Sequence, residues 1–209
     1  MEFDPSTLPQ QSMYKLMIGA IVPRPIGWIS TISPSGVANV APFSFFNAVC
    51  SNPPTVLFCV SSRKGDTPVK DTLHNVLATG DFVVNVVTYP LAEAMNLTAA
   101  NLPPHSSEFD FAGLETAPSV TVKAPRVAAS PVHFECVLDR TVPINADAVG
   151  GATVVFGTVT HLHVEDSLLI GPDKIDPVAL QPVGRMAGMT YAKIDTFFDL
   201  ERPVLPKAE

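Results

Sequence analysis

The residues with the clearest chemical potential lie in one short stretch, Ser61 to Thr72, which reads SSRKGDTPVKDT. It contains Arg63, Lys64 and Lys70, three of only thirteen lysines and arginines in the chain. We expect a helix to begin within this stretch, and the free N–H groups and positive dipole end of a helix N-terminus attract anions. The stretch is therefore a candidate phosphate site. The alternative interpretation is a solvated loop whose aspartates offset the charge.

Overall composition indicates a folded, acidic domain. The chain has 209 residues, of which 46% are hydrophobic and 16% charged, and this is ample for one hydrophobic core. Its 21 prolines and 12 glycines indicate many turns and short elements, which favours a β-rich architecture. A net charge of −7 argues against a nucleic-acid partner, because phosphate backbones are bound by clustered cations. An anionic ligand must then be bound by a small local group of basic residues.

Several common site motifs are absent from the sequence. It has no GxGxxG, GxxxxGK[ST], HExxH or GxSxG motif, so nothing indicates a Rossmann site, a P-loop, a zincin or a hydrolase nucleophile. His161 and His163 share one face of an expected strand and suggest a metal, but no third ligand follows at suitable spacing. Cys50, Cys59 and Cys136 lie far apart in apolar runs, where we expect free thiols that pack as small hydrophobic groups.

No segment has the pattern of a secretion signal or a membrane span. Residues 1–11 are polar, acidic and proline-containing, and every apolar run is broken well before about 18 residues. We therefore expect a cytoplasmic protein with no membrane partner.

Strand signals dominate the chain. Residues 25–33 and 37–41 predict a hairpin around the turn Pro34-Ser35-Gly36. Apolar or alternating runs predict four further strands, at 55–61, 82–88, 131–142 and 152–165. In the third of these, Val132, Phe134, Cys136 and Leu138 alternate with His133, Glu135, Val137 and Asp139. Gly157 marks a bulge or a close approach in the last strand.

Helices are few. The clearest one follows a Thr67 cap and Pro68, places Val69, Leu73, Val76 and Leu77 on one face, and ends at Gly80. A second is expected at 91–97, and 101–130 is a Pro- and Ser-rich excursion over the barrel. Since no regular helices separate the strands, the pattern predicts a single mainly β domain, an antiparallel barrel with a few peripheral helices.

An ordered set of short motifs carries a family resemblance. It comprises RPIGWIST at 24–31, NVAPFSFFN at 39–47, SNPP at 51–54, KDTLHN at 70–75, FVVN at 82–85, FEC at 134–136 and VGRMAGMTY at 183–191. This set resembles the flavin-reductase-like, FMN-binding split-barrel family, which includes the flavoredoxins. The resemblance implies a Greek-key split β-barrel. One departure is Met186-Ala187, where many relatives have Leu-Gly.

The resemblance also implies a cofactor site. It places Trp28 close to the flavin, and Ser30, Thr31, Ser44, Phe45 and Asn47 along the ring and ribityl chain. It assigns the phosphate to Ser61, Arg63, Lys64, Lys70 and Thr72, and puts Arg185 and Tyr191 near the flavin or a dimer seam. Taken without the family, Trp28 and the phenylalanines at 43–46 are better explained as core than as cofactor contacts.

The implied function is FMN-dependent oxidoreduction, with FAD as the alternative flavin. NADH or NADPH would bind transiently and pass hydride directly to the flavin, so no catalytic acid or base is required. Two alternatives are a flavin-carrying electron-transfer protein without its own NAD(P)H activity, and a cofactor-free interaction domain on the same barrel. The family further implies a homodimer with flavin near the interface, and a redox partner protein is a further candidate acceptor.

Overall fold

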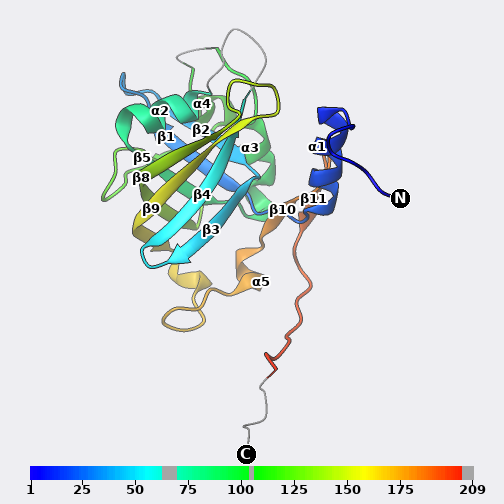
Figure 1. The fold of residues 1–209 in the computed structure, drawn as a ribbon. Coiled ribbons are helices and arrows are strands. Elements are labelled where there is room, and N and C mark those ends of the chain that lie inside the picture. Colours follow the sequence, from blue (N-terminus) through cyan, green and yellow to red (C-terminus); the bar gives the residue numbers. More distant parts are fainter. Residues whose placement is uncertain (63–69, 104–105, 204–209) are drawn as a thin grey trace, which may run out of the picture.

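A computed structural model describes residues 1–62, 70–103 and 106–203 of the chain. Figure 1 shows a mainly β architecture with helices at its periphery. The strands are β1 Gly27–Ile32, β2 Ala38–Phe43, β3 Phe46–Ser51, β4 Pro54–Ser61, β5 Asp81–Val86, β6 Thr116–Ala117, β7 Arg126–Val127, β8 Val132–Ile144, β9 Ala152–Val164, β10 Val183–Arg185 and β11 Tyr191–Lys193. The helices are α1 Gln10–Ala20, α2 Asp71–Thr79, η1 Tyr89–Leu91, α3 Ala92–Leu97, α4 Glu108–Ala112, η2 Asp166–Leu168 and α5 Pro177–Leu180.

Seven strands form one antiparallel sheet in the order β2-β1-β5-β8-β9-β4-β3. The sheet curls so that residues near its two edges meet: the ring of Phe43 on β2 lies 5.0 Å from the ring of Phe58 on β4. This is the split β-barrel expected from the sequence. In the described part of the chain no helix is both long enough and apolar enough to cross a membrane.

The first hairpin forms where the sequence predicts it. Gly36 adopts φ 87°, a left-handed conformation that is costly for residues with a Cβ, and its N–H donates to the carbonyl of Ser33. The hydroxyl of Ser33 accepts a hydrogen bond from Val37 N–H. These contacts set β1 against β2 with Gly27 opposite Phe43.

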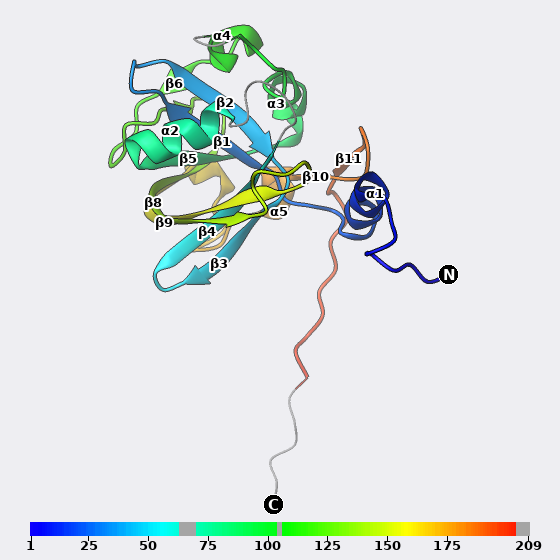
Figure 2. The same cartoon turned by 45° about the horizontal axis from the view of Figure 1, so that its top comes forward.

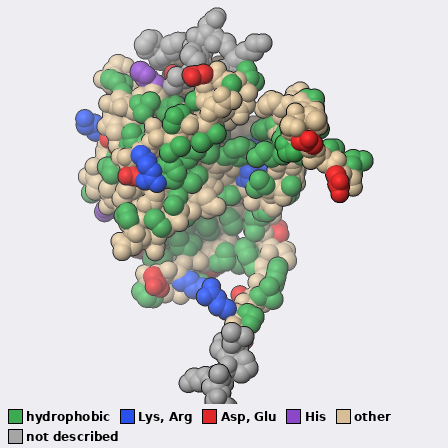
Figure 3. Space-filling model, viewed as in Figure 1, with side chains coloured by type: hydrophobic (Ala, Val, Ile, Leu, Met, Phe, Trp, Pro, Cys, Tyr) green, Lys and Arg blue, Asp and Glu red, His purple; other side chains and the backbone are tan. Residues whose placement is uncertain are grey.

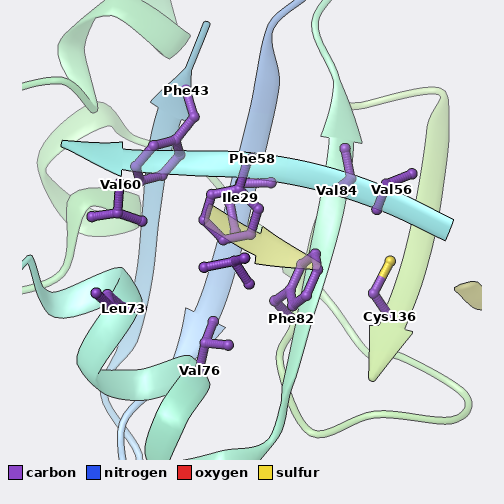
Figure 4. Close-up of a cluster of buried hydrophobic side chains, with 11 residues drawn as sticks. Ile29, Phe43, Val56, Phe58, Val60, Leu73, Val76, Phe82, Val84 and Cys136 are labelled. Atoms are coloured by element: carbon purple, nitrogen blue, oxygen red, sulfur yellow. The ribbon is translucent and has the colours of Figure 1, made fainter. Parts of the chain in front are cut away.

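The barrel interior is an apolar cluster (Figure 4). Phe58 and Phe82 pack edge to face with centroids 5.2 Å apart, and Leu73 and Val76 of α2 close one end. Each such buried side chain stabilises the fold by about 1.5–3 kcal/mol. Gly157 meets this cluster directly, because a Cβ there would lie 2.3 Å from Phe82. The close approach predicted at this glycine is present.

A second apolar cluster lies on the other face of β1, under α3 and α4. It contains Ile26, Trp28, Val40, Val87, Met95, Phe109, Val127 and Val183. Because Ile29 faces the barrel and Trp28 faces this second cluster, both faces of β1 are buried. A strand that is buried on both faces leaves few side chains for a ligand.

Some local expectations need correction. The part of the predicted helix at Thr67–Val69 lies outside the described residues, and α2 begins at Asp71. Gly80 ends α2 in a left-handed conformation as expected, but Leu77 is 55% exposed and does not belong to the buried face. Cys50 is also exposed, because β3 is the last strand of the sheet and its residues beyond Phe46 are exposed.

The excursion after α3 lies against the outer face of β5 and β8. Asp81 accepts hydrogen bonds from the N–H groups of Lys123 and Ala124, and Asn85 accepts one from Val127 N–H. Glu135 accepts hydrogen bonds from the N–H groups at 120–121. The sheet therefore binds the backbone of the excursion with the polar side chains of its outer face.

Helix α1 was not anticipated from the sequence. Ile18 is its one buried residue, and Figure 2 shows the helix beside β10 and β11, away from β8 and β9. The chain then reaches β1 through Arg24, whose backbone pairs with that of Arg185 on β10. Helix α1 and the β10–β11 hairpin therefore lie close to each other near the start of β1.

Candidate functional site

The turn from β2 into β3, residues 43–46, is the most distinctive surface feature of the described chain, and we call it the aromatic corner. Lys70 Nζ lies 5.0 Å from the ring centroid of Phe43, and Arg24 Cζ lies 5.9 Å from that of Phe45. Between them, Arg24 Nε donates to the hydroxyl of Ser44 at 3.4 Å. Phe43 itself is buried in the barrel cluster, whereas residues 44–46 are half-buried. A partly exposed aromatic segment with a cation on each side suits a flat ring that carries an anionic group.

Arg24 holds one side of the corner in place. Its side chain is only 5% exposed, and Nη1 donates to the carbonyls of Ile18 at 2.8 Å and Ile21 at 3.0 Å. Nη2 donates to the carbonyl of Met186 at 2.9 Å. Burial lowers the pKa of Arg24, although a guanidinium remains charged at neutral pH. Arg24 lies within the RPIGWIST motif, but its role could not be predicted from the sequence, because a motif does not show which backbone carbonyls surround a side chain.

Arg185 and Tyr191 face the same region from the β10–β11 hairpin. The guanidinium of Arg185 stacks on the ring of Tyr191 at 4.3 Å and donates to the carbonyl of Gly188. The Tyr191 hydroxyl donates to Asn96 Oδ1 at 3.1 Å. A cavity of about 240 Å³ lies between these residues, Arg24 and Ser44. The structure thus brings Ser44, Arg185 and Tyr191 together, three residues that the family resemblance implied.

The described residues predicted to bind the flavin phosphate lie on the other side of the aromatic corner; we call them the phosphate end. Ser61 is exposed at the end of β4, and Lys70 is half-buried at the start of α2. Arg63 and Lys64 lie outside the described residues. The ammonium of Lys70 lies near the Phe43 ring, which links the start of α2 to the aromatic corner.

Two of the predicted ligand contacts are turned inward. Thr31 is fully buried and Thr72 is 2% exposed, and the hydroxyls of both donate to Asn39 Oδ1, at 3.4 and 3.1 Å. Asn39 Nδ2 in turn donates to the buried carboxylate of Glu108 at 2.6 Å. These threonines therefore fix α2 against β1 and β2, and in the described chain they present no surface to a ligand.

Trp28 and Ser30 are also fully buried. The indole N–H of Trp28 donates to the Thr98 hydroxyl at 2.9 Å, within the second apolar cluster. Ser30 donates to the carbonyl of Pro125 and accepts from Asn85 Nδ2 at 3.0 Å. Both side chains pack between β1 and the segments that cover its outer face. For Trp28 this is the core position that the sequence indicated as the alternative to a flavin contact.

The remaining predicted contacts are accessible. Asn47 is exposed on β3, where its Oδ1 accepts from Ala48 N–H at 2.9 Å. Phe45 is half-buried, and its carbonyl accepts from Cys59 N–H, which holds the corner against β4. The accessible members of the predicted set are Ser44, Phe45, Asn47, Ser61, Lys70, Arg185 and Tyr191. By their chemistry these residues fit a flavin nucleotide, because they combine an aromatic ring, hydroxyls and cations.

A second polar cluster, around Glu135, was missed from sequence. The fully buried carboxylate of Glu135 accepts from His163 Nε2 at 2.6 Å and from the N–H and hydroxyl groups of Thr121. Burial alone would raise the pKa of Glu135, but these hydrogen bonds outweigh it and lower the pKa to about 2. A bulge between Glu135 and Cys136 shifts the register with β9, but the predicted alternation holds, because Phe134 and Cys136 face the barrel while Glu135 faces the excursion.

The histidines belong to this polar cluster. His133 is only 3% exposed and lies beneath the excursion. Burial lowers the pKa of His133 to about 4, and its Nε2 lies 2.9 Å from the carbonyl of Val127. The rings of His161 and His163 are 4.6 Å apart. Within the described residues, no three His, Cys, Asp or Glu side chains are arranged to hold a metal ion.

Comparison with known sequences places these features in context. Residues 18–178 match the family model described as the flavin reductase like domain. An uncharacterized protein of Aquifex aeolicus is 42% identical over 193 residues, which cover 92% of this chain and 95% of that protein. The matched region contains the aromatic corner, both flanking cations and the whole seven-stranded sheet.

Two solved structures share the architecture over nearly the whole chain. Nitrilotriacetate monooxygenase component B from Bacillus cereus is 34% identical with a TM-score of 0.90, covering 96% of this chain and 98% of its own. The 2-nitrobenzoate 2-nitroreductase NbaA of Pseudomonas fluorescens is 29% identical with a TM-score of 0.86, and both chains are covered completely. The architecture of this chain, including α1 and the β10–β11 hairpin, is therefore similar to that of oxidoreductase components.

Proposed function

Since this chain belongs to the family of flavin reductase-like domains, we propose that it is an FMN-dependent oxidoreductase that takes hydride from NADH or NADPH. The observation that carries the proposal is the aromatic corner between Lys70 and Arg24, with its neighbouring cavity. A coloured holoprotein that bleaches on addition of a reduced nicotinamide nucleotide is the expected result.

The accessible residues divide into two parts of a cofactor site. Lys70 and Ser61, with Arg63 and Lys64, are proposed to bind the FMN phosphate through charge-assisted hydrogen bonds. Ser44, Phe45 and Asn47 are proposed to line the ring and ribityl chain. When bound, FMN supplies a ring that accepts hydride and passes electrons onward. Thr31 and Thr72 act behind the site by holding Asn39 and α2 in position.

The nicotinamide nucleotide is proposed to bind transiently over the corner. The sequence has no dinucleotide-binding fingerprint, so the donor need only bring its reactive carbon to the exposed face of the ring. Arg185, half-buried beside the cavity, is placed to attract the charge of the donor. Electrons then pass to a small acceptor or a redox partner protein.

We also propose that the working unit is a homodimer with flavin near its interface. Exposed apolar side chains support this, since Tyr14, Met17 and Ile21 of the α1 region are 48%, 41% and 57% exposed. Figure 3 shows hydrophobic side chains on the face between the barrel and α1. Such surfaces commonly mark contacts with another chain. Light scattering during size exclusion, with and without FMN, tests this proposal. A monomer that retains stoichiometric FMN would contradict it.

The visible spectrum of the purified protein, with mass analysis of any released cofactor, distinguishes FMN from FAD. Addition of NADH or NADPH without oxygen then distinguishes a reductase, in which the flavin absorbance bleaches, from an electron-transfer flavoprotein, in which it does not. Colourless protein that takes up no flavin would instead support a cofactor-free interaction domain.

A further inference from the structure

The cavity of about 240 Å³ beside the aromatic corner has an unusual lining. It lies between α1, α3 and the β10–β11 hairpin, and its polar lining residues are Tyr14, Arg24, Ser44, Asn96, Arg185 and Tyr191. Two of these residues are arginines and none is acidic. In a chain of net charge −7, a cavity whose charged groups are all positive is a local exception.

Within the described part of the chain, no carboxylate pairs with either arginine. Among the described residues, the side-chain ion pairs are Arg140 with Asp139 and His163 with Glu135, and both are outside the cavity. Arg24 instead contacts backbone carbonyls and the Ser44 hydroxyl. The positive charge of Arg185 contributes to lowering the pKa of Arg24, after the larger effect of burial. An anion between the two guanidinium groups would relieve this repulsion.

Hydrogen-bonding capacity remains for such an anion. A guanidinium has about five N–H donors, and the contacts of Arg24 account for most of them. Arg185 donates to the Gly188 carbonyl and stacks on Tyr191, which leaves most of its donors available. The side chain of Arg24 is therefore held in place at one side of the cavity, whereas the side chain of Arg185 can reorient its N–H groups toward a bound anion.

The size of the cavity limits what it binds. Sites for drug-sized ligands span about 300–1,000 Å³, so a cavity of about 240 Å³ suits a small anionic group or one end of a larger molecule. We propose that Arg24 and Arg185 form an anion subsite that binds the carboxylate or phosphate of the molecule that exchanges electrons with the flavin. The subsite is separate from the phosphate end at Lys70, which is on the other side of the corner. The role in electron exchange rests on the proposed function.

Titration calorimetry with benzoate and with inorganic phosphate tests the subsite directly. Both probes are added to flavin-loaded and to flavin-free protein, so that anion binding is measured whether or not the chain takes up FMN. At least one probe should bind the wild-type chain, and Arg185→Gln should weaken it about tenfold or more. Arg185→Lys should retain part of the affinity, because the charge remains while the fork geometry is lost.

A matched control separates the subsite from general electrostatics. Lys174→Gln removes the same charge from an exposed position that does not line the cavity, and it should leave anion affinity unchanged. If neither probe binds the wild-type chain, or if Arg185→Gln and Lys174→Gln behave alike, the subsite does not exist. If the wild-type chain binds a probe anion but does not bind FMN, the proposed function is refuted and the anion subsite stands.

Steady-state inhibition of the flavin-loaded enzyme then identifies the source of the anion. Inhibition competitive with the nicotinamide nucleotide assigns the subsite to a phosphate of the donor. Inhibition competitive with the electron acceptor assigns it to an anionic acceptor. In either case Arg185→Gln should raise KM for that reactant about tenfold, with a smaller change in kcat. A probe that binds but inhibits neither reactant would overturn the role in electron exchange.

Discussion

On the outer face of β5 and β8, Asp81, Asn85 and Glu135 all accept hydrogen bonds from the backbone of the covering excursion. At the aromatic corner, by contrast, Arg24 and Arg185 border a cavity and have no carboxylate partner among the residues that the structure describes. The first region uses its polar groups to hold the fold together, and the second leaves positive charge available. This difference predicts that substitutions on the outer face change stability and that substitutions around the corner change binding.

The largest effect is expected at Glu135. Glu135→Ala removes the acceptor for His163, for two backbone N–H groups and for the Thr121 hydroxyl. Removing one partner from a buried, charged network costs about 3–5 kcal/mol, so the free energy of unfolding should fall by about that amount in urea denaturation. Glu165→Ala, at an exposed position after β9, is the control. If folded Glu135→Ala protein also bound FMN more weakly than the wild type, the proposed separation between a stabilising outer face and a binding corner would be contradicted.

Acid should weaken the same region. The pKa of His133 is about 4 in the folded chain against an ordinary value of 6.5, so its stabilising effect is present above pH 6.5 and lost as pH falls toward 4. The pKa of Glu135 is about 2 against 4.5, so its effect is lost below pH 4.5. We expect the free energy of unfolding to fall by about 2–3 kcal/mol between pH 7 and pH 4. In His133→Gln the fall above pH 4.5 should be smaller, and an unchanged profile would contradict the assignment.

Charge removal at the phosphate end should alter binding instead. Lys70→Ala should weaken FMN by roughly tenfold and riboflavin much less, because only FMN carries the phosphate that Lys70 is proposed to bind. Fluorescence quenching titrations with both ligands measure the ratio. Equal losses for FMN and riboflavin would mean that Lys70 supports the aromatic corner through Phe43 and does not bind the phosphate.

The smallest effect on binding is expected at Trp28. Trp28→Phe removes the hydrogen bond to Thr98 and leaves unfilled space in the second apolar cluster, which should cost about 1–3 kcal/mol of stability. Because Trp28 is fully buried, the FMN dissociation constant should change by less than about twofold, or 0.4 kcal/mol. A tenfold weaker FMN complex with an intact fold would place Trp28 against the flavin, as the family resemblance implied.

Local signals were sufficient for much of the barrel. The turn at Gly36, the end of α2 at Gly80 and the close approach at Gly157 are each set by backbone conformation or contact that only glycine accommodates well. Alternation and apolar runs located β4, β5, β8 and β9 to within a few residues. These features depend on neighbours in sequence, so they can be predicted without a three-dimensional structure.

Which side chains remain accessible could not be predicted in the same way. Ser30 and Thr31 have the chemistry of ligand contacts, but β1 is covered on one face by the excursion and on the other by the barrel. Glu135 and His163 are 28 residues apart and meet only because β8 pairs with β9. Arg24 likewise gains its partners from α1 and the β10–β11 region. Burial and pairing of this kind arise from tertiary packing, which spacing does not record.

The central claim is that the aromatic corner binds FMN and presents it to a reduced nicotinamide nucleotide. The most direct test is an anaerobic titration of the FMN-reconstituted protein with NADH and with NADPH, followed by flavin absorbance. We expect stoichiometric FMN uptake, and bleaching of the flavin band by at least one nucleotide. A protein that takes up no FMN, or whose bound flavin is bleached by neither nucleotide, would contradict it.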